Sequence, residues 1–329
     1  MIPGIVAGQM LAAASGIDPN IGINWTSRTS AADNDWRSVC WSPELGLFAA
    51  VAATGSGNRV MTSSDGINWT IRTSAANNNW TSVCWSPTLG LFAAVAYSGT
   101  GNRVMTSANG INWTTRTSAA NSAWNSVCWS PELGLFVAVA GGSGTSNRIM
   151  TSPDGINWTA RTGSADTNYL SVTWAGGLGL FVVTSNTGTG NRVMTSPDGI
   201  NWTTRTSAAD NDWGSVCWSP ELGLLVAVAY SGTGNRVMTS ANGINWTTRT
   251  SAADNGWLAV CWSPERALFV AVGLTGTGNR VMTSPNGFDW TIRTSAADNS
   301  WFTVCWSQAR SKFVAVASSG TGNRVMTSL

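Results

Sequence analysis

The stretch "WTSVCWSPTLGLFAAVAYSGTGNRVMTSANGINWTTRTS", Trp80 to Ser118, decides the fold, because near-copies of it recur along the whole chain. It breaks into four short β-prone runs at Trp80–Ser86, Leu89–Tyr97, Arg103–Ser107 and Ile111–Ser118. The segments between the runs are rich in turn residues, and Asn-Gly supplies the positive φ that a tight hairpin needs. Each copy therefore predicts four antiparallel strands.

The spacing of one tryptophan measures the repeat. The second Trp of each copy recurs at steps of 44, 44, 45, 44, 44 and 44 residues. These second tryptophans are Trp41, Trp85, Trp129, Trp174, Trp218, Trp262 and Trp306. Four strands repeated seven times predict an all-β chain, a seven-bladed β-propeller of four-stranded antiparallel blades. An open solenoid is the alternative, but it would need dissimilar repeats at its ends.

The two ends of the sequence favour a closed ring. The sequence stops at "GNRVMTSL", after a third strand, and a matching fourth strand, "GINWTSRTS", stands at Gly22–Ser30. We expect this N-terminal strand to complete the last blade, which removes two sheet edges that would otherwise invite aggregation. The predicted propeller domain covers residues 16–329. Residues 1–15 are predicted to be a non-repetitive apolar tail that docks on the body or attaches it to another protein.

Composition limits the partners and the compartment. The chain has 329 residues, a net charge of +2 and 10% charged residues, so we expect no nucleic-acid partner. The N-terminal tail has no basic start and is too short to span a bilayer, so no membrane partner is expected either. Six cysteines occupy equivalent positions in separate repeats. Buried free thiols are therefore favoured over disulfides, which indicates assembly in a reducing cytoplasm.

Two resemblances follow from the repeated motifs. The segments "SSDGINW" (Ser63–Trp69) and "SPDGINW" (Ser152–Trp158 and Ser196–Trp202) resemble the Asp-box hairpin between the third and fourth strands of sialidase-like propellers. They are one residue shorter than that motif, and some copies carry Asn in place of Asp. The similar blades, the many tryptophans and the opening "MIPGIVAGQ" are similar to tryptophan-rich propellers of bacteriophage and prophage structural proteins. This second resemblance implies a virion-associated role.

The sequence predicts no enzymatic activity. The chain contains no His, which removes the commonest general base and the usual zinc ligands. Glu44, Glu132, Glu221 and Glu265 lie in turns of four different copies, so no carboxylate pair stands out. No cofactor and no metal are expected. Sialidases hold a carboxylate with clustered arginines, but here Arg recurs once per copy at each of two positions, which favours pairing with acidic groups or carbonyls.

The tryptophans divide into three classes. The second tryptophans and the third tryptophans (the Trp25 class) are predicted to fill the wedge between blades. The first tryptophans begin the innermost strand beside the polar loop "AADND", and core packing is the simpler reading for them too. An aromatic ring with one wet end also suits ligand stacking. The first-tryptophan positions are Trp36, Trp80, Trp124, Tyr169, Trp213, Trp257 and Trp301.

Strand order places the loops on two rims. The connections "TSAADND" and "YSGTGN" are expected on one rim, and "SPELG" with "SPDG" on the other. The first rim collects most variation between copies, as at the position after the first aromatic: Arg37, Thr81, Asn125, Leu170, Gly214, Leu258 and Phe302. The predicted binding residues on this rim are Asp33, Asn34, Asp35, Trp36, Trp80, Tyr97, Trp124, Tyr169, Asp210, Asp212, Trp213, Tyr230, Asp254, Trp257, Asp298 and Trp301.

These residues predict a monomeric, non-catalytic binding or display module in a phage-type context. Polar groups beside one aromatic per blade would offer shallow sites to glycans or other surface polymers, and seven weak sites would combine by avidity. A purely structural virion module, bound to other virion proteins through residues 1–15, is the alternative. An engineered or consensus-like scaffold of high symmetry is a third reading.

Overall fold

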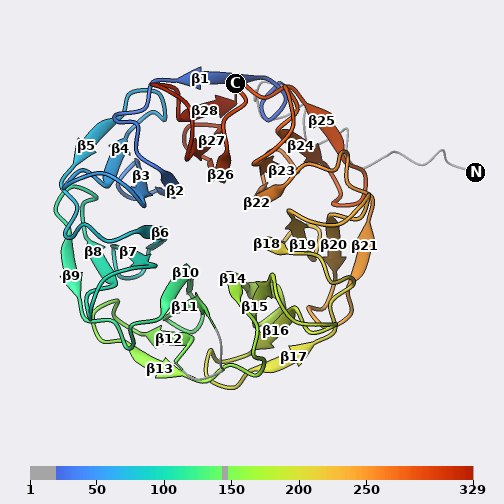
Figure 1. Cartoon of the computed structure of the whole chain (residues 1–329), viewed down its shortest axis with the longest axis horizontal. Coiled ribbons are helices and arrows are strands. Elements are labelled where there is room, and N and C mark those ends of the chain that lie inside the picture. Colours follow the sequence, from blue (N-terminus) through green and yellow to red (C-terminus); the bar gives the residue numbers. More distant parts are fainter. Residues whose placement is uncertain (1–19, 143–146, 329) are drawn as a thin grey trace, which may run out of the picture.

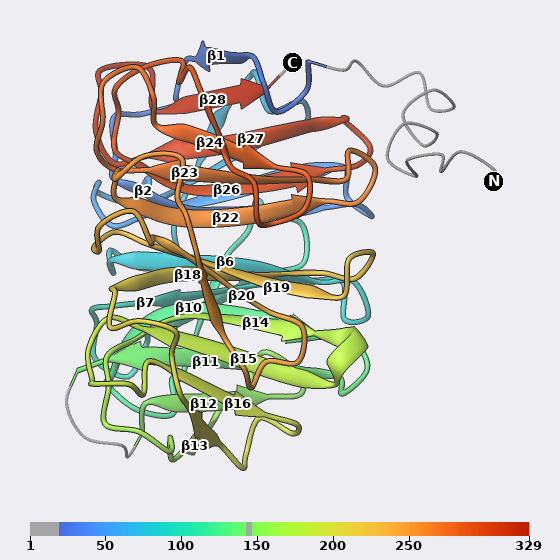
Figure 2. The same ribbon diagram turned by 90° about the vertical axis from the view of Figure 1, so that its right-hand side faces the viewer.

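The computed structural model describes residues 20–142 and 147–328. Seven four-stranded antiparallel sheets surround one axis, as Figure 1 shows, and the predicted all-β, seven-bladed propeller is confirmed. The innermost strands are β2 (Trp36–Ser42), β6 (Trp80–Ser86), β10 (Ala123–Ser130), β14 (Tyr169–Ala175), β18 (Trp213–Ser219), β22 (Trp257–Ser263) and β26 (Trp301–Ser307). Viewed from the side in Figure 2, the strands run from one rim of the ring to the other.

The remaining strands follow outward in each blade. The second strands are β3 (Leu47–Ala52), β7 (Leu91–Ala96), β11 (Leu135–Gly141), β15 (Leu180–Ser185), β19 (Leu224–Ala229), β23 (Leu268–Gly273) and β27 (Lys312–Ala317). The third strands are β4 (Val60–Ser63), β8 (Val104–Ser107), β12 (Ile149–Ser152), β16 (Val193–Ser196), β20 (Val237–Ser240), β24 (Val281–Ser284) and β28 (Val325–Ser328). The outermost strands are β5 (Thr70–Arg72), β9 (Thr114–Arg116), β13 (Thr159–Arg161), β17 (Thr203–Arg205), β21 (Thr247–Arg249), β25 (Thr291–Arg293) and β1 (Trp25–Arg28).

The first strand of the chain closes the ring. β1 pairs antiparallel with β28, from Trp25 opposite Ser328 to Arg28 opposite Val325. The last blade, blade 7, therefore contains both the N-terminal strand and the three C-terminal strands, as predicted. Blades 1 to 6 begin at β2, β6, β10, β14, β18 and β22. The predicted tail, residues 1–15, lies outside the described residues.

The core lies between neighbouring blades. The second strands are almost wholly apolar, and a continuous apolar run is typical of a strand covered on both faces. Ala93 and Val95 of β7 face blade 3, for example, while Phe92 and Ala94 face blade 1. Within the described ranges the only helix is a 3₁₀ turn at Gly176–Leu178, and no helix has the length and apolarity needed to span a membrane.

The loops divide between two rims as expected. On the loop rim, the connection from the fourth strand to the next blade meets the connection between second and third strands, because the Gly57 N–H donates to Asn77 Oδ1. On the opposite hairpin rim, the turn between third and fourth strands packs on the neighbouring blade. Gly110, at φ +71°, lies so close to the Leu47 side chain that a Cβ there would be 2.7 Å from it.

Candidate functional site

The first tryptophans are the largest fully buried side chains of the fold. All six have exposed fractions of 0%, and Tyr169 in blade 4 is 1% exposed. Each indole N–H donates to a backbone carbonyl four residues earlier, as Trp36 does to Ala32 at 3.0 Å. The predicted stacking of ligands on these rings is therefore wrong for Trp36, Trp80, Trp124, Tyr169, Trp213, Trp257 and Trp301, because no ring face is open.

The second and third tryptophans are less completely buried than the first. Six of the seven second tryptophans pack on a phenylalanine of the second strand with ring centroids 4.4–4.7 Å apart, and Trp218 lies opposite Leu225 instead. Six third tryptophans lie 6.0–6.4 Å from the same rings, and all seven are partly buried. The expected packing of the second tryptophans between blades is confirmed, since each belongs to or packs against an inter-blade core cluster. Sequence gives the spacing of an aromatic but not its depth between blades, so it did not show that the first tryptophans are buried more deeply than the other two classes.

The predicted aspartates of the loop rim join blades to each other. The carboxylates accept a backbone N–H from the preceding blade at 2.6–2.7 Å, in the pairs Asp33–Gly322, Asp210–Gly190, Asp254–Gly234 and Asp298–Gly278. The arginines Arg192, Arg236, Arg280 and Arg324 lie 3.6–3.8 Å from the same oxygens. Asn77 and Asn121 make the same bond in two other blades. This loop position therefore links two blades through a hydrogen-bond acceptor, and Asn serves as well as Asp because the negative charge is not required.

The next loop residue fastens the loop to its own blade. Asn34 is 7% exposed, and its Nδ2 donates to the Asn58 carbonyl at 2.8 Å. Four equivalent asparagines make this bond at 2.8–2.9 Å. Asp212, the residue after Asn211, instead joins two blades by pairing with Arg192 of the preceding blade at 2.9 Å. Most of the predicted polar site is therefore occupied by contacts within the protein.

The two predicted tyrosines differ in their surroundings. The Tyr230 hydroxyl accepts a hydrogen bond from Asn186 Nδ2 at 2.6 Å, and burial raises the pKa of this tyrosine. Tyr97 is 54% exposed and lines an opening at the axis. Of the sixteen predicted residues, Tyr97 alone lines this opening.

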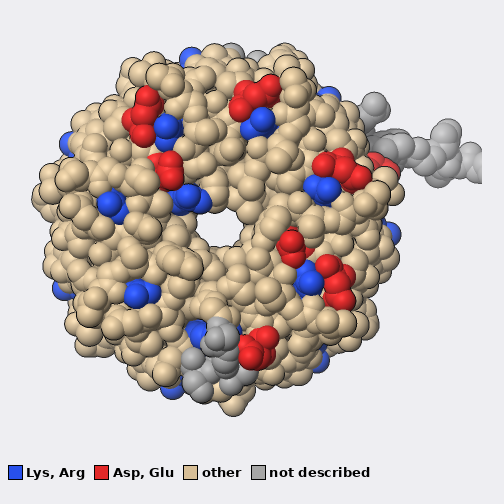
Figure 3. Space-filling view, in the orientation of Figure 1, with Lys and Arg blue, Asp and Glu red and all other residues tan. Residues whose placement is uncertain are grey.

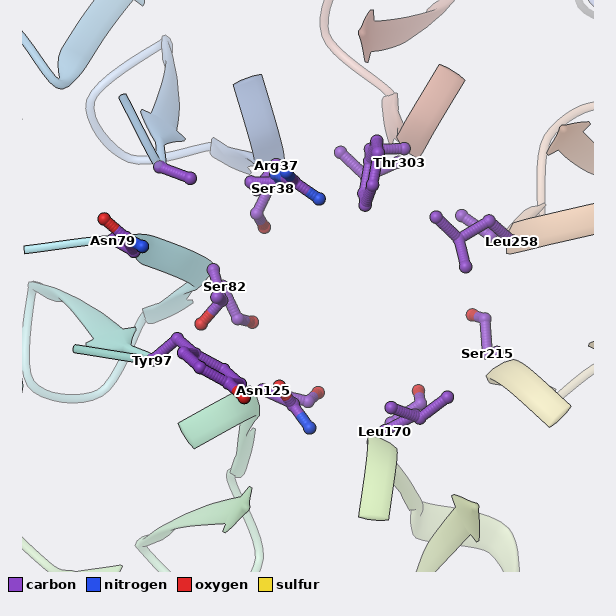
Figure 4. Close-up of a pocket in the computed structure, with 17 residues that line it drawn as sticks. Arg37, Ser38, Asn79, Ser82, Tyr97, Asn125, Leu170, Ser215, Leu258 and Thr303 are labelled. Atoms are coloured by element: carbon purple, nitrogen blue, oxygen red, sulfur yellow. The ribbon is translucent and has the colours of Figure 1, made fainter. Parts of the chain in front are cut away.

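The axial opening is a hollow of about 460 Å³ on the loop rim. Figure 3 shows it at the centre of the ring, inside a circle of basic side chains, most of which have an acidic side chain beside them. All seven blades contribute to it through the residue that follows the first aromatic. This axial ring consists of Arg37, Thr81, Asn125, Leu170, Gly214, Leu258 and Phe302. Figure 4 shows Arg37 and Leu258 directed toward the centre of the opening.

A β-bulge aims these side chains at the axis. In β2 the register jumps from Trp36 opposite Ala52 to Ser38 opposite Val51, so Arg37 has no partner in the sheet. The same shift occurs at the start of all seven inner strands. A bulge re-aims the side chain of the extra residue. The divergence between copies at this position was visible in the sequence, but the bulge that gives it a location was not.

A second tier of small residues lies beside the axial ring. It comprises Ser38, Ser82, Ser126, Ser171, Ser215, Ala259 and Thr303. The five serine oxygens each accept an N–H from a valine of the next blade at 3.1–3.4 Å, as Ser38 does from Val83. Because the oxygen is the acceptor, each hydroxyl proton is left to donate. This serine tier therefore offers donors to the opening.

The axial ring has a polar and an apolar arc. Arg37, Thr81 and Asn125 come from three consecutive blades, and the Asn125 amide donates to the Tyr169 carbonyl at 2.7 Å. Leu170, Leu258 and Phe302 come from the rest of the ring, and Gly214 leaves a gap among them. The guanidinium of Arg37 stacks on Phe302, 4.0 Å from the ring centroid, where the two arcs meet. The opening can thus hold a ligand of mixed polarity.

Ionisable groups elsewhere offer little reactivity. Within residues 20–142 and 147–328, no cluster of His, Cys, Asp and Glu could hold a metal ion. The six cysteines are free, as expected. Burial raises the pKa of Cys40 and Cys217 to about 12, so both stay protonated near neutrality. Thiols in this form are poor nucleophiles and poor metal ligands.

These features define a seven-bladed β-propeller with one hollow at the axis of its loop rim. No protein-family model matches the chain, and no curated protein matches its sequence. Among solved structures, it is similar to YCF48 bound to D1 peptide, with a TM-score of 0.68 and 14% identity over 94% of this chain and 97% of that one. It is also similar to virginiamycin B lyase from Staphylococcus aureus, with a TM-score of 0.73 and 10% identity over 93% and 98%.

The second likeness corrects one expectation. The expectation that the chain is no enzyme is wrong as a conclusion from its fold and composition, because a lyase is built on the same seven-bladed architecture. An identity of 10% carries the fold alone and none of the lyase's chemistry. The propeller fold is therefore not a ground for excluding catalysis.

Proposed function

We propose that the protein is a binding module whose axial opening holds a peptide segment of a partner protein. The observation that carries this proposal is where the repeats diverge. Residues that join the blades are nearly constant, whereas the axial ring has six different residue types at seven equivalent positions. A ring that served packing alone would repeat one side chain, as the first tryptophans do.

The size and lining of the opening suit a few residues of an extended chain. A hollow of about 460 Å³ falls within the range of pockets that bind small ligands or short peptide segments. The apolar arc would take an aliphatic or aromatic side chain. The serine tier and Asn79 would donate to or accept from the peptide backbone. YCF48, a propeller of similar architecture, has been solved with a peptide, which supports this class of ligand.

A glycan is the second candidate, and one observation favours it. Tyr97 is 54% exposed at the opening, beside Asn79 and Asn125, and a sugar can stack on a phenol ring while amides bind its hydroxyls. Glycan binding of this kind would use one site at the axis, in place of the seven weak sites that the sequence predicted. Attachment to virion proteins through residues 1–15 remains a prediction, because those residues lie outside the described ones.

The test is a screen of the purified protein against a random peptide library, with a glycan array in parallel. Replacing both Leu170 and Leu258 by Asp should weaken peptide binding by about tenfold or more, because buried leucine contacts contribute about 1.5–3 kcal/mol each. Leu45→Asp is the matched control, since Leu45 is a 40% exposed leucine on the hairpin rim. Its affinity should equal that of the wild type.

Each outcome of the screen decides between the candidates. Peptides that lose affinity in the Leu170→Asp/Leu258→Asp variant alone support the proposal. Glycan signals that disappear in Tyr97→Ala support the second candidate instead. Failure of both screens would leave a purely structural module and reject the proposed function.

A further inference from the structure

We propose that Arg37 and Phe302 form a subsite for a carboxylate of the bound peptide. This inference rests on the proposed peptide binding and names the chemical group of the peptide that the opening would recognise. Arg37 is the only formally charged side chain among the residues that line the opening. At the equivalent positions the other blades carry neutral residues, so the charge lies at one point of an otherwise neutral ring.

The guanidinium is held in a fixed orientation. Its carbon lies 4.0 Å from the centroid of the Phe302 ring, and stacking of this kind fixes the plane of the group. Figure 4 shows nitrogen atoms of Arg37 facing the centre of the opening. A planar fork that is already oriented matches the two oxygens of a carboxylate.

The donors of Arg37 are mostly unused. One nitrogen lies 3.4 Å from Asp35, and both side chains are about 30% exposed (29% and 32%), so this pair is weak. Asp35 is also shared with Arg324, whose Nη1 lies 3.4 Å from its other oxygen. The Nε–H of Arg37 is buried and has no hydrogen-bond partner. A guanidinium has five N–H donors, so an acceptor that enters the opening finds several available.

The surroundings favour an acceptor on an apolar chain. The hydroxyls of the serine tier are left to donate, which suits a ligand that has only acceptors. Leu258 and Phe302 belong to the apolar arc, which begins next to Arg37, and an alkyl or aryl group of the ligand would pack on them. A carboxylate next to an apolar side chain fits both. Such a group comes either from the free C-terminus of a peptide or from an Asp or Glu side chain.

The first experiment uses small probes and an NMR readout. N-acetyl-leucine carries the carboxylate and the apolar chain, and N-acetyl-leucinamide is the same molecule without the charge. Titration of ¹⁵N-labelled protein should move the Arg37 Nε–H signal with saturation for the acid and leave it in place for the amide. Arg37→Gln and Arg37→Lys have no Nε–H, so binding by these variants is followed through the backbone N–H signals of Thr81 and Leu258, which also line the opening. Both substitutions should weaken binding of the acid by about tenfold or more, because Lys keeps the charge but not the planar guanidinium.

Arg310→Gln is the matched control, because Arg310 is an exposed arginine on the hairpin rim. Equal binding of acid and amide, or unchanged binding of the acid by Arg37→Gln, would overturn the carboxylate subsite. Tighter binding of inorganic phosphate than of N-acetyl-leucine at the same signal would overturn it as well, in favour of a general anion site.

The second experiment separates the two sources of the carboxylate. Peptide libraries are compared with a free or an amidated C-terminus, each with and without Asp and Glu. Loss of binding on amidation assigns the subsite to the C-terminus, and loss on removal of acidic residues assigns it to side chains. Peptides that bind equally in all four libraries, yet lose affinity in Leu170→Asp/Leu258→Asp, would overturn this inference while the proposed function stands.

Discussion

At the scale of single residues, the indole N–H groups of the second tryptophans show how one blade depends on the previous one. Four of them donate to a glutamate in the preceding blade at 2.5–2.7 Å, as Trp85 does to Glu44. The N–H groups of Trp41, Trp129 and Trp218 are buried and have no partner. In each case the preceding blade lacks the glutamate and has Ala309, Thr88 or Gly177 at its position.

Thr88→Glu should therefore stabilise the protein. The new carboxylate would reach the Trp129 N–H as Glu44 reaches Trp85, and a partly exposed hydrogen bond to a charged group contributes about 1 kcal/mol. Urea unfolding measures the gain. In a Trp129→Phe background the same substitution should have no effect, and a gain of equal size there would show that the N–H is not its cause.

The structural role of the arginines was predictable at this scale, whereas for the first tryptophans the sequence left ligand stacking open beside core packing. A polar side chain that recurs once per blade is expected to make the same structural contact in each blade. Arg59 accordingly donates to the backbone carbonyls of Gly55 and Ala53. The first tryptophan also repeats, but its polar neighbours in sequence suggested a wet surface. Its own N–H bond to a loop carbonyl folds the loop over the ring, and no sequence pattern records that closure.

At the scale of elements, the hairpins between third and fourth strands are organised by one side chain. Asp154 accepts backbone N–H groups of Ile156 and Asn157 at 2.8 Å, and the Ser152 hydroxyl also donates to it. Burial raises the pKa of this carboxyl, but the hydrogen bonds outweigh burial and hold it at about 2. Asp198 is held at about 2 in the same way. Asn109 replaces the aspartate in blade 2 and accepts the same backbone bonds.

These aspartates should set part of the acid stability. An aspartate in the unfolded chain has a pKa of about 3.9, and these two have a pKa of about 2 in the folded protein. Their ionised forms therefore stabilise the folded state above pH 4, and this stabilisation is lost as the pH falls toward 2. The double variant Asp154→Asn/Asp198→Asn should lose less Tm between pH 4 and pH 2 than the wild type. Asn109→Asp is the opposite control and should steepen the loss, and parallel curves for all three proteins would contradict the argument.

The bulge at the start of each inner strand explains why the candidate site was placed one residue off. Regular alternation predicts that Arg37 lies on one face of a blade, packed against a neighbour. The bulge removes it from the pairing and points it at the axis instead. Bulges have no strong residue signature, so the sequence showed which position varies but not that seven such positions meet in one hollow.

At the scale of the whole molecule, the number of blades and the closure of the ring followed from the sequence. The repeat length fixed four strands per blade, and the unmatched third and fourth strands at the two ends had to pair. The shape of the axial opening did not follow, because it depends on how seven side chains of different size converge. A sequence repeat predicts the structure that its copies share, but not the shape of a site to which each copy contributes a different residue.

Deleting residues 16–30 should open the ring. The deletion removes β1 and the packing of Trp25 on Phe313, and loss of one such Trp alone costs about 3–5 kcal/mol. We expect a lower Tm and, by light scattering, association through the exposed edge of β28. Deleting residues 1–15 is the control and should leave both unchanged. A full Tm after loss of residues 16–30 would show that β1 does not close the ring.

The interruption of the serine tier has a consequence for the order in which the ring comes apart. Ala259 has no hydroxyl, and in the described residues Thr303 makes no bond like that of Ser38, so blade 7 lacks this link to both neighbours. Hydrogen exchange should therefore find its inner strand the first to open. Arg37 and Phe302 face each other across that same seam. A ligand that contacts both residues would link blade 1 to blade 7. Because it binds only the closed ring, it would stabilise the closed ring against opening.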